Sequence, residues 1–159
     1  MTLYEGLKIV HIITASVLFG TGLGTAIYML YANILKNIPI IALATRRVVK
    51  ADWLFTGISG VLQPLTGISL LYLKGYKLTN TWTIAVFTCY CIAAVCWFIV
   101  VYLQIRCRDL AIAALKSNTA LPKKYQQYFV AWVILGFPAF LSLIVIFYLM
   151  ANNPFYIAL

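Results

Sequence analysis

His11 is the only histidine in the 159 residues, and it lies near the start of a long apolar run at about residues 7–35. A run of this length can cross a bilayer as a helix, since one crossing takes about 20 residues. An imidazole inside a membrane span either has a hydrogen-bond partner or performs a function, because polar groups in hydrocarbon are costly. Two interpretations follow. His11 is a structural residue bonded to a backbone carbonyl or a tyrosine, or it is an axial ligand to a haem iron.

Small residues beside His11 would leave room for a flat ring. At about 100° per residue, Ala15 and Gly22 fall on the His11 side of the helix, as do Thr25 and Met29. If His11 is a metal ligand, a haem is the cofactor that these residues favour. Zinc and copper are not expected, because a single histidine lacks companion ligands.

The second axial ligand is left open by the sequence. Met150 lies at the same end of the last apolar run and is one candidate. The alternatives are His11 from a second copy of the chain, or a five-coordinate iron. Gly20 and Gly24 form a GxxxG pair on the opposite side of the first run, which is typical of a contact between membrane helices and would suit a homodimer.

A second polar group lies where two of the runs reach the other membrane face. It consists of Asp52, Gln104, Arg106, Arg108 and Asp109. We expect an ion pair between Asp52 and Arg106 that fixes the two helices. The alternative is a site for an anionic lipid headgroup or substrate. A Ser–His–Asp hydrolase is excluded, because these acids and the histidine lie at opposite membrane faces.

Gln63 directly precedes Pro64 near the middle of the second run. Proline removes one backbone hydrogen bond from a helix. The buried amide of Gln63 also needs a partner inside the protein. We expect an interhelical hydrogen bond, with a ligand or proton contact as the alternative.

These residues must be held by membrane helices. Hydrophobic residues make up 64% of the chain and charged residues 9%, whereas soluble domains carry about 25% charge. We predict one all-α domain, a four-helix antiparallel transmembrane bundle with spans at about residues 7–35, 52–72, 82–104 and 128–150. Residues 40–50 are expected to form a short amphipathic helix in the membrane interface. The third helix should continue to about Lys116, and Phe155 and Tyr156 should anchor a short tail.

Twelve basic residues face three acidic ones, for a net charge of +9. Nine of the basic residues follow the first and third spans, and three lie on the other side of the membrane. The positive-inside rule then places both termini outward. No basic patch interleaved with aromatic residues lies outside the spans, so a nucleic-acid partner is not expected.

The chain resembles a bacterial integral membrane family of unknown function, domain of unknown function 2269. Four blocks carry the resemblance in the family's order: LKIVHIITASVLFGTGLGTAIYML, ADWLFTGISGVLQPLTG, LQIRCRDLA and GFPAFLSLIVIFYLM. The resemblance covers about the whole chain. It implies a four-helix protein of the bacterial cytoplasmic (inner) membrane and supplies no activity.

The opening LKIVHII also looks like the first helix of two more distant families, the copper-resistance D-like membrane proteins and the haem b-containing protoporphyrinogen oxidases of bacteria. In the oxidases a histidine at this place is a haem ligand, a role that falls on His11 here. The oxidases also depend on a lysine in helix three, and the run from Trp82 to Gln104 has none. The likeness therefore implies haem b at His11 and does not imply the oxidase reaction.

Three functions remain open. The first is a redox or haem-handling role, which would include a haem-dependent membrane oxidoreductase, although the chain lacks a full catalytic set. The second is a non-enzymatic bundle that binds a lipid or a partner membrane protein. The third is a small-solute transporter, which is least favoured because the spans hold few polar groups.

Overall fold

The computed structural model describes residues 2–152, so the tail with Phe155 and Tyr156 lies outside the described residues. The described part is helical, with short connections and no strand. Its elements are α1 (Leu3–Ile34), α2 (Ile38–Ala51), the π-helical segment η1 (Asp52–Gly57), α3 (Ile58–Leu73), α4 (Thr81–Ser117) and α5 (Lys123–Ala151).

Four helical rods result, because α2, η1 and α3 run on as one helix over Ile38–Leu73. Each rod is long and apolar enough to cross a membrane, judged by length and composition. The prediction of an all-α fold with four helices able to cross a membrane is confirmed. The continuation of the third helix is confirmed as well, since α4 runs to Ser117 and ends at Asn118 in a left-handed conformation.

Helix α2 differs from the expected interfacial helix at residues 40–50. It is amphipathic, but the chain passes through η1 into α3 without leaving the helical path. Its apolar face, which includes Ile41, Thr45 and Val48, is buried and packs on α4. The predicted amphipathic character of this helix is confirmed, but its apolar face is covered by protein.

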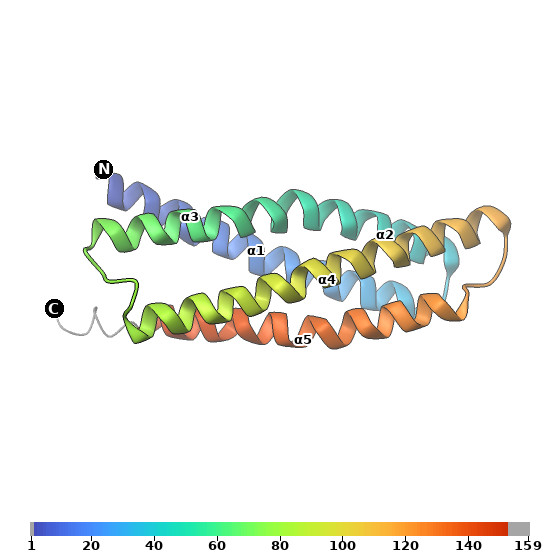
Figure 1. Ribbon diagram of the computed structural model, residues 1–159. Helices are drawn as coiled ribbons and strands as arrows, with labels where there is room; N and C mark the ends of the chain where they lie inside the picture. Colours follow the sequence, from blue (N-terminus) through green and yellow to red (C-terminus); the bar gives the residue numbers. More distant parts are fainter. Residues whose placement is uncertain (1, 153–159) are drawn as a thin grey trace.

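The four rods associate in two pairs. Helix α1 packs on η1 and α3, and α4 packs on α5 (Figure 1). Helix α2 joins the pairs, since it contacts both α1 and α4. Elsewhere, the backbones of α3 and α4, and those of α1 and α5, hardly approach each other. The pairs are therefore separated toward the end where α1 begins and α5 ends.

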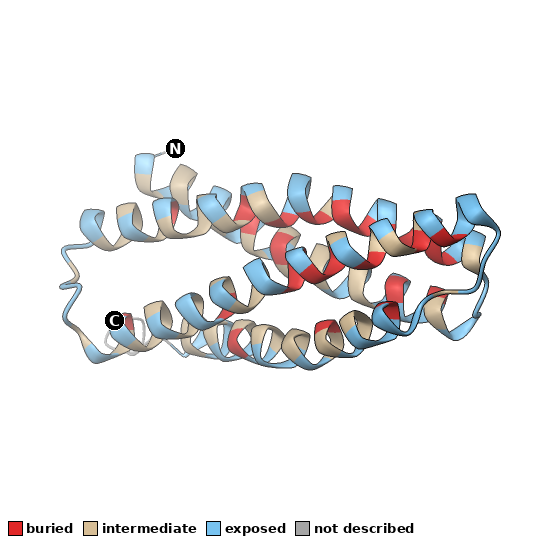
Figure 2. Ribbon diagram, turned by 45° about the vertical axis from the view of Figure 1, so that its right-hand side comes forward, coloured by how far each residue is buried: buried red, intermediate tan, exposed pale blue. Residues whose placement is uncertain are grey.

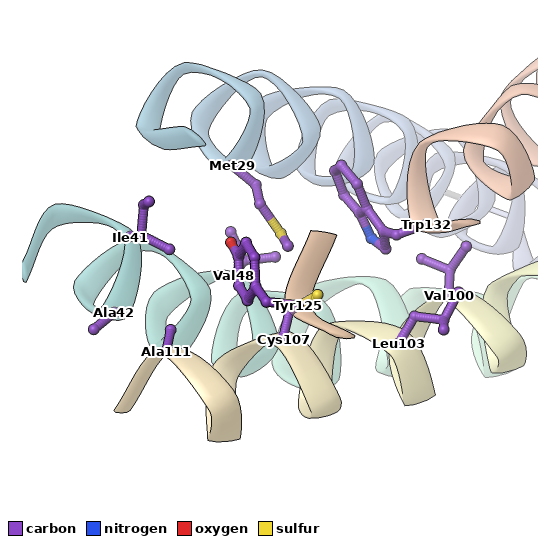
Figure 3. Close-up of a cluster of buried hydrophobic side chains, with 10 residues drawn as sticks. All are labelled: Met29, Ile41, Ala42, Val48, Val100, Leu103, Cys107, Ala111, Tyr125 and Trp132. Atoms are coloured by element: carbon purple, nitrogen blue, oxygen red, sulfur yellow. The ribbon is translucent and has the colours of Figure 1, made fainter. Parts of the chain in front are cut away.

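The hydrophobic core occupies the end of the bundle that contains α2, where the buried residues concentrate (Figure 2). Side chains from α1, α2, α4 and α5 meet there (Figure 3). Tyr125 reinforces this end, because its hydroxyl donates to Asn33 Oδ1 at 2.8 Å. The cluster consists of Met29, Ile41, Ala42, Val48, Val100, Leu103, Cys107, Ala111, Tyr125 and Trp132.

Candidate functional site

Two cavities lie between the helix pairs. The His11 cavity, at the open end, has a volume of about 620 Å³ and is lined by His11, Ala15, Trp82 and Met150 among others. Its walls are overwhelmingly apolar. Its polar lining residues include Gln63, Lys8 and Lys74. Such a cavity has the size and character of a small-molecule site, which ranges over about 300–1,000 Å³.

His11 is held against α3. Its Nδ1 lies 2.7 Å from the Thr66 hydroxyl, and that hydroxyl donates to the Leu62 carbonyl at 2.6 Å. Because the Thr66 proton is used in this way, Nδ1 carries the proton of the imidazole and donates to Thr66. Nε2 is then the unprotonated nitrogen, with a lone pair for a ligand. A hydrogen bond from the opposite ring nitrogen is the usual support of a metal-binding histidine.

A glycine allows this close approach. A Cβ atom placed on Gly67 would lie 3.3 Å from His11 Cε1, closer than most carbon contacts. A side chain at position 67 would therefore require the imidazole to shift by a few tenths of an ångström away from the α3 backbone.

Gln63 makes the interhelical hydrogen bonds expected of it. Its Nε2 donates to the His11 carbonyl at 2.9 Å and to the Thr14 hydroxyl at 2.6 Å. The amide thus ties α3 to α1 one turn from the imidazole. It also lines the His11 cavity.

The other predicted haem-site residues divide between the two cavities. Ala15 and Met150 line the His11 cavity together with His11 itself. Gly22 lines the second cavity instead. Gly20 and Gly24 are exposed, and a Cβ atom on either would meet nothing within 4 Å.

The Asp52 cavity has a volume of about 530 Å³ and lies closer to the buried core. Its wall includes Gly22, Asp52, Trp97, Gln104 and Trp132, and it is also overwhelmingly apolar.

Asp52 is 3% exposed and opens the π-helical segment. Its Oδ1 accepts from the hydroxyls of Thr25 and Thr56, both at 3.2 Å. Its Oδ2 accepts from Gln104 Nε2 at 2.6 Å. Three neutral donors from three elements therefore surround this carboxylate.

The predicted ion pair between Asp52 and Arg106 is wrong. Among residues 2–152, the ion pair present joins Arg108 to Asp109 at 2.8 Å, on the surface. Arg106 is exposed and lies over the Tyr102 ring at 5.9 Å. The reason is helical geometry: residues two apart lie about 200° apart around the axis, so a helix that turns Gln104 toward Asp52 turns Arg106 away.

The two cavities share a wall that contains Leu18, Pro64 and Tyr90. Within it, the Tyr90 hydroxyl donates to the Gly60 carbonyl. Gly60 lies four residues before Pro64, which has no N–H, so this carbonyl loses its normal helical partner. Tyr90 supplies the missing donor from across the gap between the helix pairs.

Sequence reasoning missed Thr66, Thr56 and Tyr90 as members of these sites. Threonines are frequent in membrane helices and mostly bond their own backbone, so their types alone carry no signal. Tyr90 could have been sought, because Pro64 implies an unpaired carbonyl one turn earlier that needs a donor from another helix.

The chain matches a family described as a predicted integral membrane protein (DUF2269) over residues 5–154. No curated protein and no solved structure matches it. The match supports the membrane setting that the four apolar helices indicate.

Proposed function

The chain belongs to the DUF2269 family of predicted integral membrane proteins, and we propose that it binds haem b in the His11 cavity, with His11 as an axial ligand. The observation that carries the proposal is the hydrogen bond from His11 Nδ1 to Thr66, at 2.7 Å. This bond fixes the ring and leaves Nε2 for the iron.

The residues around His11 suit this group. Met150 lines the same cavity and supplies a thioether of the kind that serves as an axial ligand in cytochromes. Lys8 and Lys74 line it as well and lie near helix ends, where cations suit the two propionate carboxylates of a haem. Most of the remaining wall surface is apolar, as suits a haem ring. The group would supply one-electron chemistry, while the protein holds and orients it.

The test is the visible spectrum of the protein purified from haem-replete cells. We expect a Soret band in the natural protein and none in His11→Ala. Met150→Leu should keep haem but change the spectrum of its reduced form, since one axial ligand is replaced. Met29→Leu, a buried methionine outside this cavity, is the control and should leave the spectrum unchanged. A colourless natural protein that also takes up no added haemin would overturn the proposal.

A second candidate function is association with another membrane protein, and homodimer formation is its simplest case. The observation that favours it is the exposed Gly20–Gly24 face, which no helix of the same chain covers. Because a Cβ atom at either glycine meets nothing within 4 Å, leucine fits there without disturbing the monomer. A dimer that dissociates in Gly24→Leu would support this function, and a natural protein that is monomeric in nanodiscs would reject the homodimer.

We place the protein in the bacterial cytoplasmic membrane with both termini outward. The support is the charge distribution, nine basic residues after the first and third spans against three on the other side. In this orientation the His11 cavity lies toward the outer face and the buried core toward the cytoplasm.

A further inference from the structure

Unpartnered polar atoms point to a second ligand. In the described part of the chain, four buried side-chain atoms have no hydrogen-bond partner: Thr83 Oγ1, Trp97 Nε1, Gln104 Oε1 and Trp132 Nε1. Each of the four residues lines a cavity: Thr83 lines the His11 cavity, and the other three line the Asp52 cavity. Folded proteins leave few such atoms unpaired, because a buried polar group without a hydrogen-bond partner is destabilising. Their concentration among the residues of one cavity wall points to a ligand that would pair with Gln104 Oε1 and Trp132 Nε1. Because neither atom has accessible surface of its own, these two side chains would turn toward the cavity to meet it.

We propose that the Asp52 cavity binds a membrane quinol, with its polar ring at Gln104 and Trp132. A quinol hydroxyl donates, as the Gln104 Oε1 acceptor requires, and its oxygens accept, as the indole N–H groups require. Gln104 is only 2% exposed and Trp132 5% exposed, so both are embedded in the wall.

The charges around the cavity exclude anionic headgroups. Within residues 2–152 no lysine or arginine lines it, so a phosphate or carboxylate headgroup would have no counter-charge. The Asp52 carboxylate would repel such a group. Asp52 itself accepts from three neutral donors and does not depend on a cationic ligand. A neutral headgroup fits this environment.

The side chains of the wall favour a ligand with an aromatic ring and an apolar tail. Tyr90, Trp97, Phe140 and Trp132 contribute aromatic surface on several sides. The lining also includes Phe98 and Phe137, which are 65% and 72% exposed on the outer surface of the bundle. The cavity therefore reaches the lipid-facing surface, and a tail can extend from it into the membrane.

The second unpaired indole lies along the same path. Trp97 and Gln104 are seven residues apart on α4, two turns, which places them on one face about 10 Å apart along the axis. A quinol ring at Gln104 and Trp132 leaves the Trp97 indole beside the apolar body of the ligand, so the quinol pairs two of the three unpartnered atoms in this cavity wall.

The experiment measures binding of decylubiquinol to the protein in nanodiscs, under anaerobic conditions, by isothermal titration. We expect saturable binding by the natural protein. Trp132→Phe keeps an aromatic ring and loses the N–H donor, and it should weaken binding roughly fivefold, as expected for one hydrogen bond. Gln104→Leu should weaken it roughly tenfold. Gln127→Leu, an exposed glutamine on α5, is the matched control and should bind like the natural protein.

Two ligand controls test the chemical class. Decylbenzene lacks the hydroxyls and 1-decanol lacks the ring, so neither should displace decylubiquinol. The proposal is overturned if decylubiquinol does not saturate, if Trp132→Phe and Gln104→Leu both bind like the natural protein, or if either control ligand competes equally well. His11→Ala should keep quinol binding, so failure of the haem proposal is distinguishable from failure of this one.

Discussion

Asp52 shows how an acidic residue can lie inside this bundle without a basic partner. Its two oxygens accept from Thr25, Thr56 and Gln104, which are all neutral. Hydrogen bonding of this kind offsets part of the cost of removing a carboxylate from water. The polarity of the site therefore comes from neutral side chains, and each of them can be replaced without leaving a second charge unpaired.

We predict that Asp52→Asn is tolerated and Asp52→Leu is not. In Asp52→Asn the new carbonyl continues to accept from the threonines. The new amide N–H can donate to Gln104 Oε1, which is unpartnered, if the Gln104 amide turns over. The expected loss of stability is below about 1 kcal/mol for Asn and about 1–3 kcal/mol for Leu, which leaves buried donors unmatched. Thermal unfolding in detergent measures both. Equal losses in the two variants would show that the charge itself is required.

Thr66 is predicted to act as the residue that positions His11. Thr66→Val keeps the shape but removes the acceptor of the imidazole N–H, so it should cost about 1–3 kcal/mol of stability. It should also weaken haem binding roughly 10- to 100-fold, the usual effect of losing the partner of a ligating histidine. Thr66→Ser should restore both properties.

Ser69→Ala is the control for Thr66, because the Ser69 hydroxyl bonds to the carbonyl of Leu65 in its own helix. It should change neither stability nor haem titration by a measurable amount. If Thr66→Val keeps the haem affinity of the natural protein, the role assigned to the Nδ1 hydrogen bond is wrong.

At the scale of the elements, Pro64 and Tyr90 form one functional unit although they lie on different helices. Proline leaves the Gly60 carbonyl without its helical donor, and the Tyr90 hydroxyl bonds to it. The pair joins α3 to α4 where their backbones are otherwise apart. The wall between the two cavities depends on this contact.

A double-mutant cycle tests this dependence. Tyr90→Phe should cost about 1 kcal/mol in the natural protein, because the buried carbonyl loses its donor. In Pro64→Ala the new backbone N–H can bond to Gly60, so the same change should cost much less. We expect a coupling energy of about 0.5–1.5 kcal/mol from unfolding measurements on the four proteins. Additive effects would show that Tyr90 does not compensate for the proline.

The second helix shows what sequence periodicity can and cannot predict. Residues 40–50 were correctly predicted to form an amphipathic helix, and Ile41 and Val48 lie on its buried face. The partner that covers the apolar face was not predicted. Membrane lipid can cover an apolar helix face, and so can another helix with small side chains such as Ala111 of α4. Likewise, hydropathy located Asp52 and Gln104 at one depth but did not give the rotation of each helix. That rotation decides whether Gln104 or Arg106 meets the carboxylate.

For the whole molecule, the pairing of helices produces the two cavities. The core closes the end that contains α2, and large side chains bridge the separated pairs elsewhere, as Phe19 does by stacking on Phe140 at 4.8 Å. The number of spans was predictable, because an apolar run of about 20 residues has few other stable arrangements. The cavities were not predictable, since they depend on which helices pack together. In lipid, the choice of helix partners is decided by side-chain fit more than by hydrophobicity.

The orientation of the molecule is predicted from charge alone, and it can be tested by cysteine labelling. The natural cysteines, Cys89, Cys91, Cys96 and Cys107, are first replaced by alanine. Lys77→Cys then lies in the connection between α3 and α4, and Lys116→Cys lies near the far end of α4. A membrane-impermeant maleimide should label position 77 in intact cells and position 116 only after permeabilisation, because the basic connections stay in the cytoplasm. Each substitution removes one positive charge and keeps the asymmetry, so the variants should insert like the natural protein. Labelling of position 116 in intact cells would reverse the orientation and place the His11 cavity toward the cytoplasm.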